Sequence, residues 1–211
     1  MKLHTVAQGE CLLSIAHANG FFIETLWNHA GNADLRKKRG DPNCLFPGDS
    51  VFIPDKRRKE ESCSTGRLHV FRLVGVPAKV AIEVLYCGKP RTGERYTITI
   101  DGASESGEVG RDGVVRFHVP PNAKKGSLVV GAGLLRTEYT LQLGHLDPVN
   151  EIAGVQGRLK NLGHYHGPID GALNQDTKVA LMLFQHDLGL ECSGELDAAT
   201  LQALRQNHER L

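Results

Sequence analysis

The sequence lacks any apolar run close to the roughly 20 residues that a membrane-spanning helix needs, which excludes a chain with helical membrane spans. It also lacks an excess of charge, because 25 Lys and Arg residues face 24 Asp and Glu residues. Binding to a polyanion through bulk charge, as in many nucleic-acid-binding proteins, is therefore not expected. The first ten residues contain no apolar stretch of the kind a secretory leader requires. This predicts synthesis in the cytoplasm and, for a role in a periplasm, delivery by a secretion machine.

Cysteine is scarce, odd in number and scattered, at positions 11, 44, 63, 87 and 192, with no Cys-X-X-Cys. A disulfide framework in a small secreted domain would be denser, so mostly reduced thiols are predicted. Cys11 and Cys44 are the only pair that we suspect, because they fall in one small module. His164-X-His166 has the spacing of metal ligands on a strand, but no cysteine or carboxylate pattern completes a set. We therefore predict no metal and no cofactor.

Hydrophobic periodicity divides the chain into four parts and predicts a multi-domain α+β protein. Residues 1–54 predict a strand, two short helices and a second strand. Residues 55–66 are almost free of apolar side chains and predict an exposed linker. Residues 67–146 alternate with a period of two and predict a small antiparallel β-sandwich. Residues 147–211 return to the helical period and predict a three-helix module.

The middle segment contains four runs of alternating apolar residues, which predict strands. Arg111-Asp112-Gly113 stands between two of these runs and is typical of a hairpin turn. The runs are Val80-Ile82-Val84-Tyr86, Tyr96-Ile98-Ile100, Val115-Phe117-Val119 and Tyr139-Leu141-Leu143.

The last segment contains an internal repeat with a spacing of 23 residues. Gly171-X-Leu173-Asn174-X-X-Thr177 recurs as Gly194-X-Leu196-Asp197-X-X-Thr200. In each copy the glycine permits a tight turn, the leucine anchors a loop, and Asn or Asp caps the following helix. The repeat is a structural motif and carries no chemistry of its own.

The first segment resembles the LysM family along its whole length. The matching residues include Thr5-Val6, Gly9-Glu10, Leu12-X-Ser14-Ile15-Ala16, Leu26-Trp27-Asn28 and Leu45-Phe46-Pro47-Gly48-Asp49. The resemblance implies a shallow groove that binds chains of N-acetylglucosamine. Its walls would be formed by Gly9, Glu10, Cys11 and Leu12 on one side and by Asn43, Leu45 and Phe46 on the other. Two departures stand out: Cys11 replaces the usual threonine, and residues 31–43 form a longer connector than most such modules have.

The last segment is similar to the three-helix peptidoglycan-binding module found beside many cell-wall hydrolases. The matching residues include Val155-Gln156-X-Arg158-Leu159, Ile169-Asp170-Gly171, Ala180-Leu181-X-X-Phe184-Gln185 and Gly194-X-Leu196-Asp197. The resemblance implies binding to glycan or stem peptide, and it assigns no individual ligand-contacting residue.

The combination of these modules in a leaderless chain resembles accessory proteins of type VI or phage-tail-like injection machines. Within the connector, the basic run Arg36, Lys37, Lys38 and Arg39 is a candidate for docking on a spike or effector protein. Since Asp34 and Asp41 flank the run, a solvated surface is the simpler interpretation.

No catalytic set is recognisable. Asp170 and Asp197 occupy turn and cap positions, and no serine has a nucleophile context such as Gly-X-Ser-X-Gly. We therefore predict a non-enzymatic peptidoglycan binder, accessory to an injection machine. One alternative is an adaptor whose first module docks on protein. A third is a subunit of a cell-wall hydrolase that does not act alone.

Overall fold

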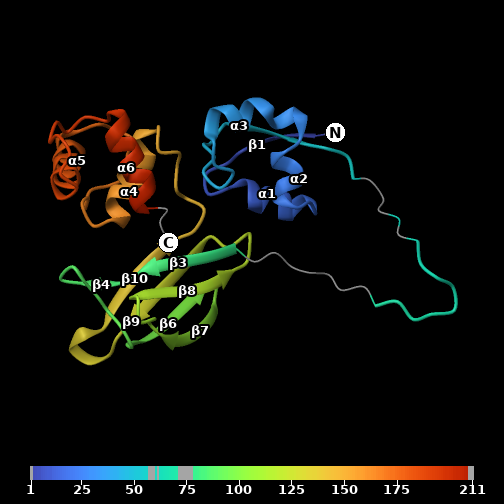
Figure 1. Ribbon diagram of the computed structural model, residues 1–211, viewed down its shortest axis with the longest axis horizontal. Helices are drawn as coiled ribbons and strands as arrows, with labels where there is room; N and C mark the ends of the chain where they lie inside the picture. The colour runs from blue at the N-terminus through green and yellow to red at the C-terminus, as the bar shows by residue number, and fades with distance from the viewer. Residues whose placement is uncertain (1, 57–59, 61, 71–77, 209–211) are drawn as a thin grey trace.

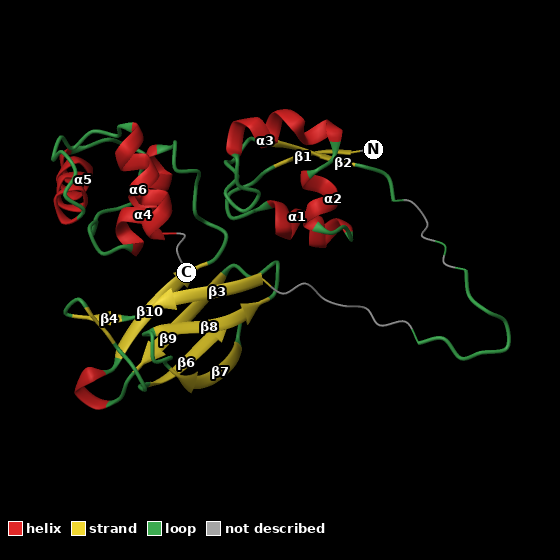
Figure 2. Ribbon diagram, viewed as in Figure 1, coloured by secondary structure: helices red, strands yellow, loops and turns green. Residues whose placement is uncertain are grey.

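The computed structural model describes residues 2–56, 60, 62–70 and 78–208 of the 211-residue chain (Figure 1). In these residues the protein is a mixed α/β structure with six α-helices and four small antiparallel sheets. Three separate hydrophobic cores define what we call the first module (residues 2–54), the middle domain (78–146) and the C-terminal module (147–208). Helices gather in the two outer parts, while the middle domain is mostly strand (Figure 2). None of the helices in the described ranges is long and apolar enough to cross a membrane.

The first module is a two-stranded sheet covered by short helices. β1 (Lys2–Thr5) pairs antiparallel with β2 (Ser50–Ile53), so the module's ends lie side by side. α1 (Leu12–Asn19) ends at Gly20 as the sequence predicts, and α2 (Ile23–Trp27) follows. Apolar side chains from both helices and from β2 close the core, with Trp27 packed partly buried against it.

The predicted connector of the first module contains a further helix, so the expectation of two helices was wrong. A 3-10 turn (Ala30–Asn32) leads into α3 (Ala33–Arg39). Asp34 in its first turn and the basic run in its last turn both complement the helix dipole. Leu35 anchors α3 in the core. The charge run that suggested a polar loop is therefore the C-terminal turn of a helix.

The middle domain places two sheets around one core. The four-stranded sheet has the order β10 (Thr137–Gln142), β9 (Lys125–Val130), β6 (Arg95–Ile100) and β7 (Ala103–Glu108). Beside it, β3 (Ala78–Glu83) pairs with β8 (Val114–Val119). The core takes side chains from both sheets, including Ile98 and Leu128 from the first and Phe117 from the second. A small hairpin, β4 (Leu85–Tyr86) with β5 (Lys89–Pro90), lies at one end.

Four strands of the middle domain agree with the sequence prediction. The first predicted run also covers the short β4, while β5 and two longer strands were missed. Those predicted are β3 (Ala78–Glu83), β6 (Arg95–Ile100), β8 (Val114–Val119) and β10 (Thr137–Gln142). The longer missed strands are β7 (Ala103–Glu108) and β9 (Lys125–Val130). The hairpin predicted at residues 111–113 was also wrong. The turn is there, but it joins β7 to β8, which lie in different sheets.

The C-terminal module consists of α4 (Ile152–Asn161), α5 (Gln175–Asp187) and α6 (Ala198–His208) around one core. The predicted caps are confirmed. The Asn174 side chain accepts a hydrogen bond from Thr177 N at 2.9 Å, and the Asp197 side chain accepts one from Thr200 N at 2.7 Å. Both copies of the repeat therefore act as helix starts.

The first module lies beside the C-terminal helices, and both lie on the same side of the middle domain (Figure 1). The described residues of the predicted linker, 55, 56, 60 and 62–66, are exposed. Residues 67–70, predicted to belong to the β-sandwich, are also exposed and lie outside any strand, and Leu68 has an exposed fraction of 93%. The short segment 143–151, between β10 and α4, runs where the three parts meet. It is the segment that positions the candidate binding surfaces.

Candidate binding surfaces

The first predicted groove wall is built around the turn that precedes α1. The Glu10 carboxylate accepts a hydrogen bond from Ala7 N at 2.9 Å and lies 2.8 Å from His4 Nε2. Burial alone would raise the pKa of Glu10, but these hydrogen bonds outweigh it and bring the pKa below its ordinary value. Cys11 stands at the N-cap position of α1, and its backbone N–H donates to Ser14 Oγ. Leu12 is fully buried and belongs to the core, so its side chain offers nothing to a ligand.

The second predicted wall is bonded directly to the first, because Leu12 N donates to Pro42 O at 3.0 Å. Asn43 is exposed, whereas Leu45 is buried in the core like Leu12. Phe46 is half-buried, and its ring lies 5.3 Å from the Arg39 guanidinium carbon. Of the seven predicted groove residues, Gly9, Glu10, Cys11, Asn43 and Phe46 are thus accessible at least in part. Their binding to glycan remains a prediction.

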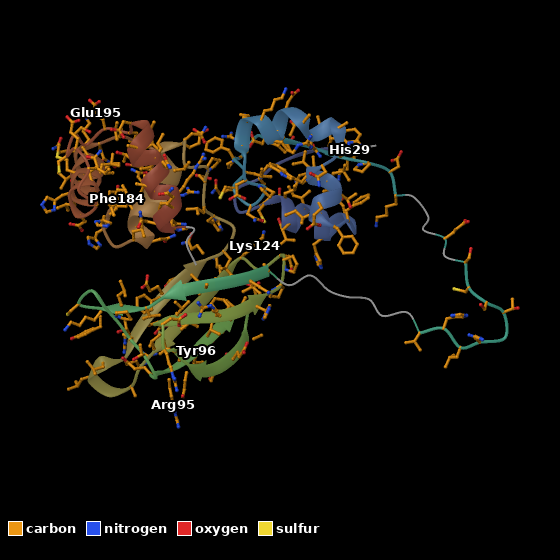
Figure 3. All side chains as sticks on the ribbon, in the orientation of Figure 1. His29, Arg95, Tyr96, Lys124, Phe184 and Glu195 are labelled. Carbon is orange, nitrogen blue, oxygen red and sulfur yellow. The ribbon has the colours of Figure 1, made fainter. Side chains whose placement is uncertain are left out.

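The protein's own chain covers part of the first wall. A Cβ atom added to Gly9 would lie 3.0 Å from His145 Nε2, and one added to Gly144 would lie 2.9 Å from the Gly9 carbonyl oxygen. The contact at Gly144 leaves no room for a side chain, and the φ angle of +82° at Gly9 favours glycine there as well. The Asp147 carboxylate is hydrogen-bonded to Gln8, and burial raises its pKa. Lys124, labelled in Figure 3, lies on the edge of the middle domain that faces the first module and attracts Glu10.

Residues that flank the second wall also contact the C-terminal half. Arg39 is buried and holds Asp49 through two hydrogen bonds of 2.6 and 3.1 Å, while its Nη1 donates to Glu151 at 3.0 Å. Burial alone would raise the pKa of Asp49, but Arg39, Lys38 and Phe46 N donate to it and lower the pKa to about 2. Cys44 is buried, and Arg158 Nη2 lies 3.6 Å from its sulfur. Burial raises the pKa of the Cys44 thiol to about 12, so it stays protonated at neutral pH.

A cavity of about 280 Å³ remains between the second wall and the C-terminal module. It is lined from both sides, by Arg39, Gly40, Asp41, Pro42 and Cys44 of the first module and by Pro148, Val149, Arg158 and Arg205 of the C-terminal half. The boundary between the two modules is therefore hollowed at this place.

The predicted docking run is only partly available to a partner. Arg39 is buried, so its inclusion was wrong. Its charge is taken up inside the protein by Asp49 and Glu151. Arg36 donates to the backbone carbonyls of Trp27 and His29 and holds the end of α2. Lys37 and Lys38 are exposed, although Lys38 also donates to Asp49 at 2.9 Å. Docking through the exposed lysines remains a prediction.

The C-terminal module contains two fully buried glutamines whose role sequence reasoning missed. The Gln156 side chain donates to Asp170 Oδ1, Ala172 O and Thr177 Oγ1, and its oxygen accepts from Asp170 N and Gly171 N. Gln185 repeats the arrangement in the second copy: it donates to Glu195 O and Thr200 Oγ1 and accepts from Gly194 N. Each glutamine fixes the loop that precedes a helix. The signal was present, because both glutamines stand in the matched motif.

No catalytic arrangement is visible in the part of the chain that the structure describes. Hydrogen bonds from Gln156 and Ala172 N lower the pKa of Asp170, and a hydrogen bond from Thr200 N lowers that of Asp197. Both carboxylates are thus engaged in turns and caps. Among the described residues, no three His, Cys, Asp or Glu side chains are placed to hold a metal ion. None of the five cysteines, all of which lie in the described residues, forms a disulfide in the structure.

Comparison with known proteins identifies the class of the C-terminal module. Residues 149–204 match the family model described as a putative peptidoglycan binding domain. The chain is also similar to the N-acetylmuramoyl-L-alanine amidase CwlM of Mycobacterium tuberculosis, with 32% identity over 93 residues, which are 44% of this chain. The chain spans 22% of the length of that relative. No solved structure matches the chain. The match confirms the sequence interpretation of the C-terminal module, and the resemblance of the first module to LysM remains a prediction.

Proposed function

We propose that this chain is a non-catalytic peptidoglycan-binding protein whose C-terminal module holds the cell wall. The observation that carries the proposal is the match of residues 149–204 to a peptidoglycan-binding domain. The loops of this module are held by Gln156 and Gln185, so it presents a fixed surface without help from a ligand. In this proposal the middle domain spaces the two outer modules.

Sedimentation of the full chain with purified sacculi tests the proposal. The Gln156→Ala variant, which loses the loop contacts, should remain in the supernatant, while the exposed Gln202→Ala variant should sediment like the unaltered chain. A full chain that stays in the supernatant at low salt, with intact peptidoglycan, would show that the C-terminal module does not bind the wall.

The first module adds a second contact in this proposal, with N-acetylglucosamine chains lying along Gly9, Glu10 and Cys11 and the accessible Asn43 and Phe46. An adaptor role, in which the module docks on protein, is the alternative. One observation favours that alternative: the same face already contacts polypeptide, through His145 and Glu151.

A catalytic role is the third candidate, because a relative is named as an amidase. The proposal predicts that purified protein releases no soluble fragments from peptidoglycan. Time-dependent release of muropeptides that follows the protein through successive purification steps would establish an enzyme instead.

For delivery, we propose that a contractile, type VI-like injection machine carries the protein to a periplasm, with Lys37 and Lys38 at the docking face. The support is the resemblance of the modular arrangement to accessory proteins of such machines. Deletion of the sheath gene should abolish export of the tagged protein. Unchanged amounts outside the cytoplasm in that mutant would rule out this route.

A further inference from the structure

The face of the first module that would take glycan is also the face that meets the rest of the chain. Gly9 of its first wall contacts Gly144 and His145, and the adjoining Gln8 is hydrogen-bonded to Asp147. Arg39 and Cys44, which flank its second wall, contact Glu151 and Arg158. The two walls therefore share one neighbour, the stretch that runs from the end of the middle domain into α4.

We propose that residues 144–151 occupy the groove face of the first module in a closed state, and that N-acetylglucosamine chains compete with this segment for the face. The proposal rests on the glycan-binding role proposed above for the first module. It makes the inter-module contact a self-docking surface whose partner is an irregular stretch of the same chain that carries two carboxylates, Asp147 and Glu151.

The close approach at the first wall supports competition. The Gly9 backbone lies against the His145 imidazole and against Gly144, and a side chain at Gly144 would collide with the Gly9 carbonyl oxygen. A sugar ring in contact with the Gly9 backbone needs the space that His145 fills. Segment and sugar cannot occupy this position together.

The charges at the second wall supply complementarity. Arg39 is held in place by Asp49, stacks near Phe46 and presents one remaining guanidinium nitrogen to Glu151 at 3.0 Å. The Glu151 side chain is 35% exposed, so this pair lies at the rim of the contact. An acidic residue at this place in the segment is what a pre-oriented arginine selects.

Covalent connection makes such a modest contact effective. A tethered segment acts at an effective concentration in the millimolar range, so a few contacts suffice to keep a surface covered. The cavity of about 280 Å³ beside Cys44 shows that the contact is not packed like a core, which keeps opening accessible. When only a fraction of the molecules is open, the measured affinity for a ligand falls by that fraction.

Two substitutions should weaken the contact between the segment 144–151 and the first module, each at a different end of the groove face. Glu151→Lys places a positive charge against Arg39 at the second wall, and Asp147→Ala removes the hydrogen bond with Gln8 at the first. Neither side chain belongs to a module core. Glu105→Lys, on the exposed strand β7 of the middle domain, is the matched charge reversal away from the contact.

Two measurements on the full chain decide the matter. The probe ligand is tetra-N-acetylchitotetraose, measured by titration calorimetry. The second readout is the rate of Cys44 alkylation, followed by mass spectrometry, because opening removes the cover that Arg158 gives to the sulfur. Both opening variants should bind the probe at least tenfold more tightly than the unaltered chain and Glu105→Lys, and Cys44 should react at least tenfold faster.

Equal affinities in all four proteins would overturn the competition. No binding of the probe by an opening variant whose Cys44 reacts faster would instead overturn the glycan-binding role of the first module, and the competition with it. Unchanged Cys44 rates in both opening variants would overturn the closed state itself. Sacculus sedimentation of the full chain reports on the C-terminal module separately. Failure of the competition is thereby distinguished from failure of peptidoglycan binding.

Discussion

The first module and the C-terminal module stabilise their loops with different chemistry. In the C-terminal module, the neutral amides of Gln156 and Gln185 satisfy backbone groups on both sides and are fully buried. In the first module, the turn before β2 is held by the Asp49 carboxylate, with Arg39 and Lys38 donating to it. The hydrogen bonds of the two glutamines all have partners inside the C-terminal module, whereas Arg39 of the first module also binds Glu151 of the C-terminal module. Buried neutral amides thus make a module self-contained, and buried charges connect it to a neighbour.

Among the changes that test this comparison, the loss of one glutamine should have the largest effect on stability. Gln156→Ala removes the partner of two backbone N–H groups and of a buried threonine hydroxyl, so the C-terminal module should lose about 3 kcal/mol of stability. Thermal unfolding followed by far-UV circular dichroism measures this loss. Fluorescence of Trp27, the only tryptophan, reports on the first module and should show an almost unchanged transition.

Gln202→Ala on the exposed side of α6 is the matched control and should leave both transitions in place. If Gln156→Ala shifts the Trp27 transition as far as the circular dichroism transition, the C-terminal module is not self-contained and the contrast between the modules is lost.

The two modules also differ in how much of their structure the sequence predicted. The reason is again that one module is held by local contacts and the other by distant ones. The C-terminal module was predicted down to its caps, because Asn174 and Thr177, or Asp197 and Thr200, are three residues apart and their geometry is local. In the first module, α3 was missed although its own residues signal it, because a charge run was given more weight than Leu35 and the favourable dipole. The burial of Arg39 could not be predicted, since its partners stand 10 and 112 residues away.

The middle domain shows the same limit for strands. β7 reads Ala-Ser-Glu-Ser-Gly-Glu and is exposed along almost all of its length, so it carries no alternating apolar signal. It is a strand because its backbone pairs with β6 over six residues. The wrong hairpin at residues 111–113 has a related cause. A turn signal is local, but the choice of sheet for the next strand depends on partners elsewhere.

The second-largest effect is expected from acid, which should lower the stability of the first module through Asp49. The pKa of Asp49 is about 2 in the folded protein against an ordinary value of 3.8, so between these values the unfolded chain binds more protons. Its contribution, about 2 kcal/mol, is complete above about pH 5 and is lost as the pH falls through 2. The first module should therefore lose stability at low pH through this residue.

Urea titrations followed by Trp27 fluorescence between pH 6 and 2 measure the loss. In Asp49→Asn, stability at pH 6 should already be lower by about the same amount, and the acid-dependent part should shrink accordingly. A variant with unchanged stability at pH 6 would mean that the charged cluster does not stabilise the first module.

The smallest effect is expected at His208, the last described residue of α6, where the C-terminal module reaches the middle domain. His208 lies 2.9 Å from Asn161 Nδ2 and borders a cavity lined by Lys79, Arg116 and His118 of β3 and β8. Burial, together with the positive charge of Arg158, lowers its pKa from 6.5 to about 4. The folded state therefore binds fewer protons than the unfolded state between these values. Stability is complete above about pH 6.5 and falls as the pH drops through 4. Because the side chain is only partly buried, we expect a loss on the order of 1 kcal/mol.

The imidazole signals of His208 in an NMR titration should move with a midpoint near 4, and in His208→Gln the stability should no longer change through this group between pH 6.5 and 4. A midpoint near the ordinary histidine value would mean that the end of α6 is solvated, and the C-terminal module would then be self-contained on this side as well.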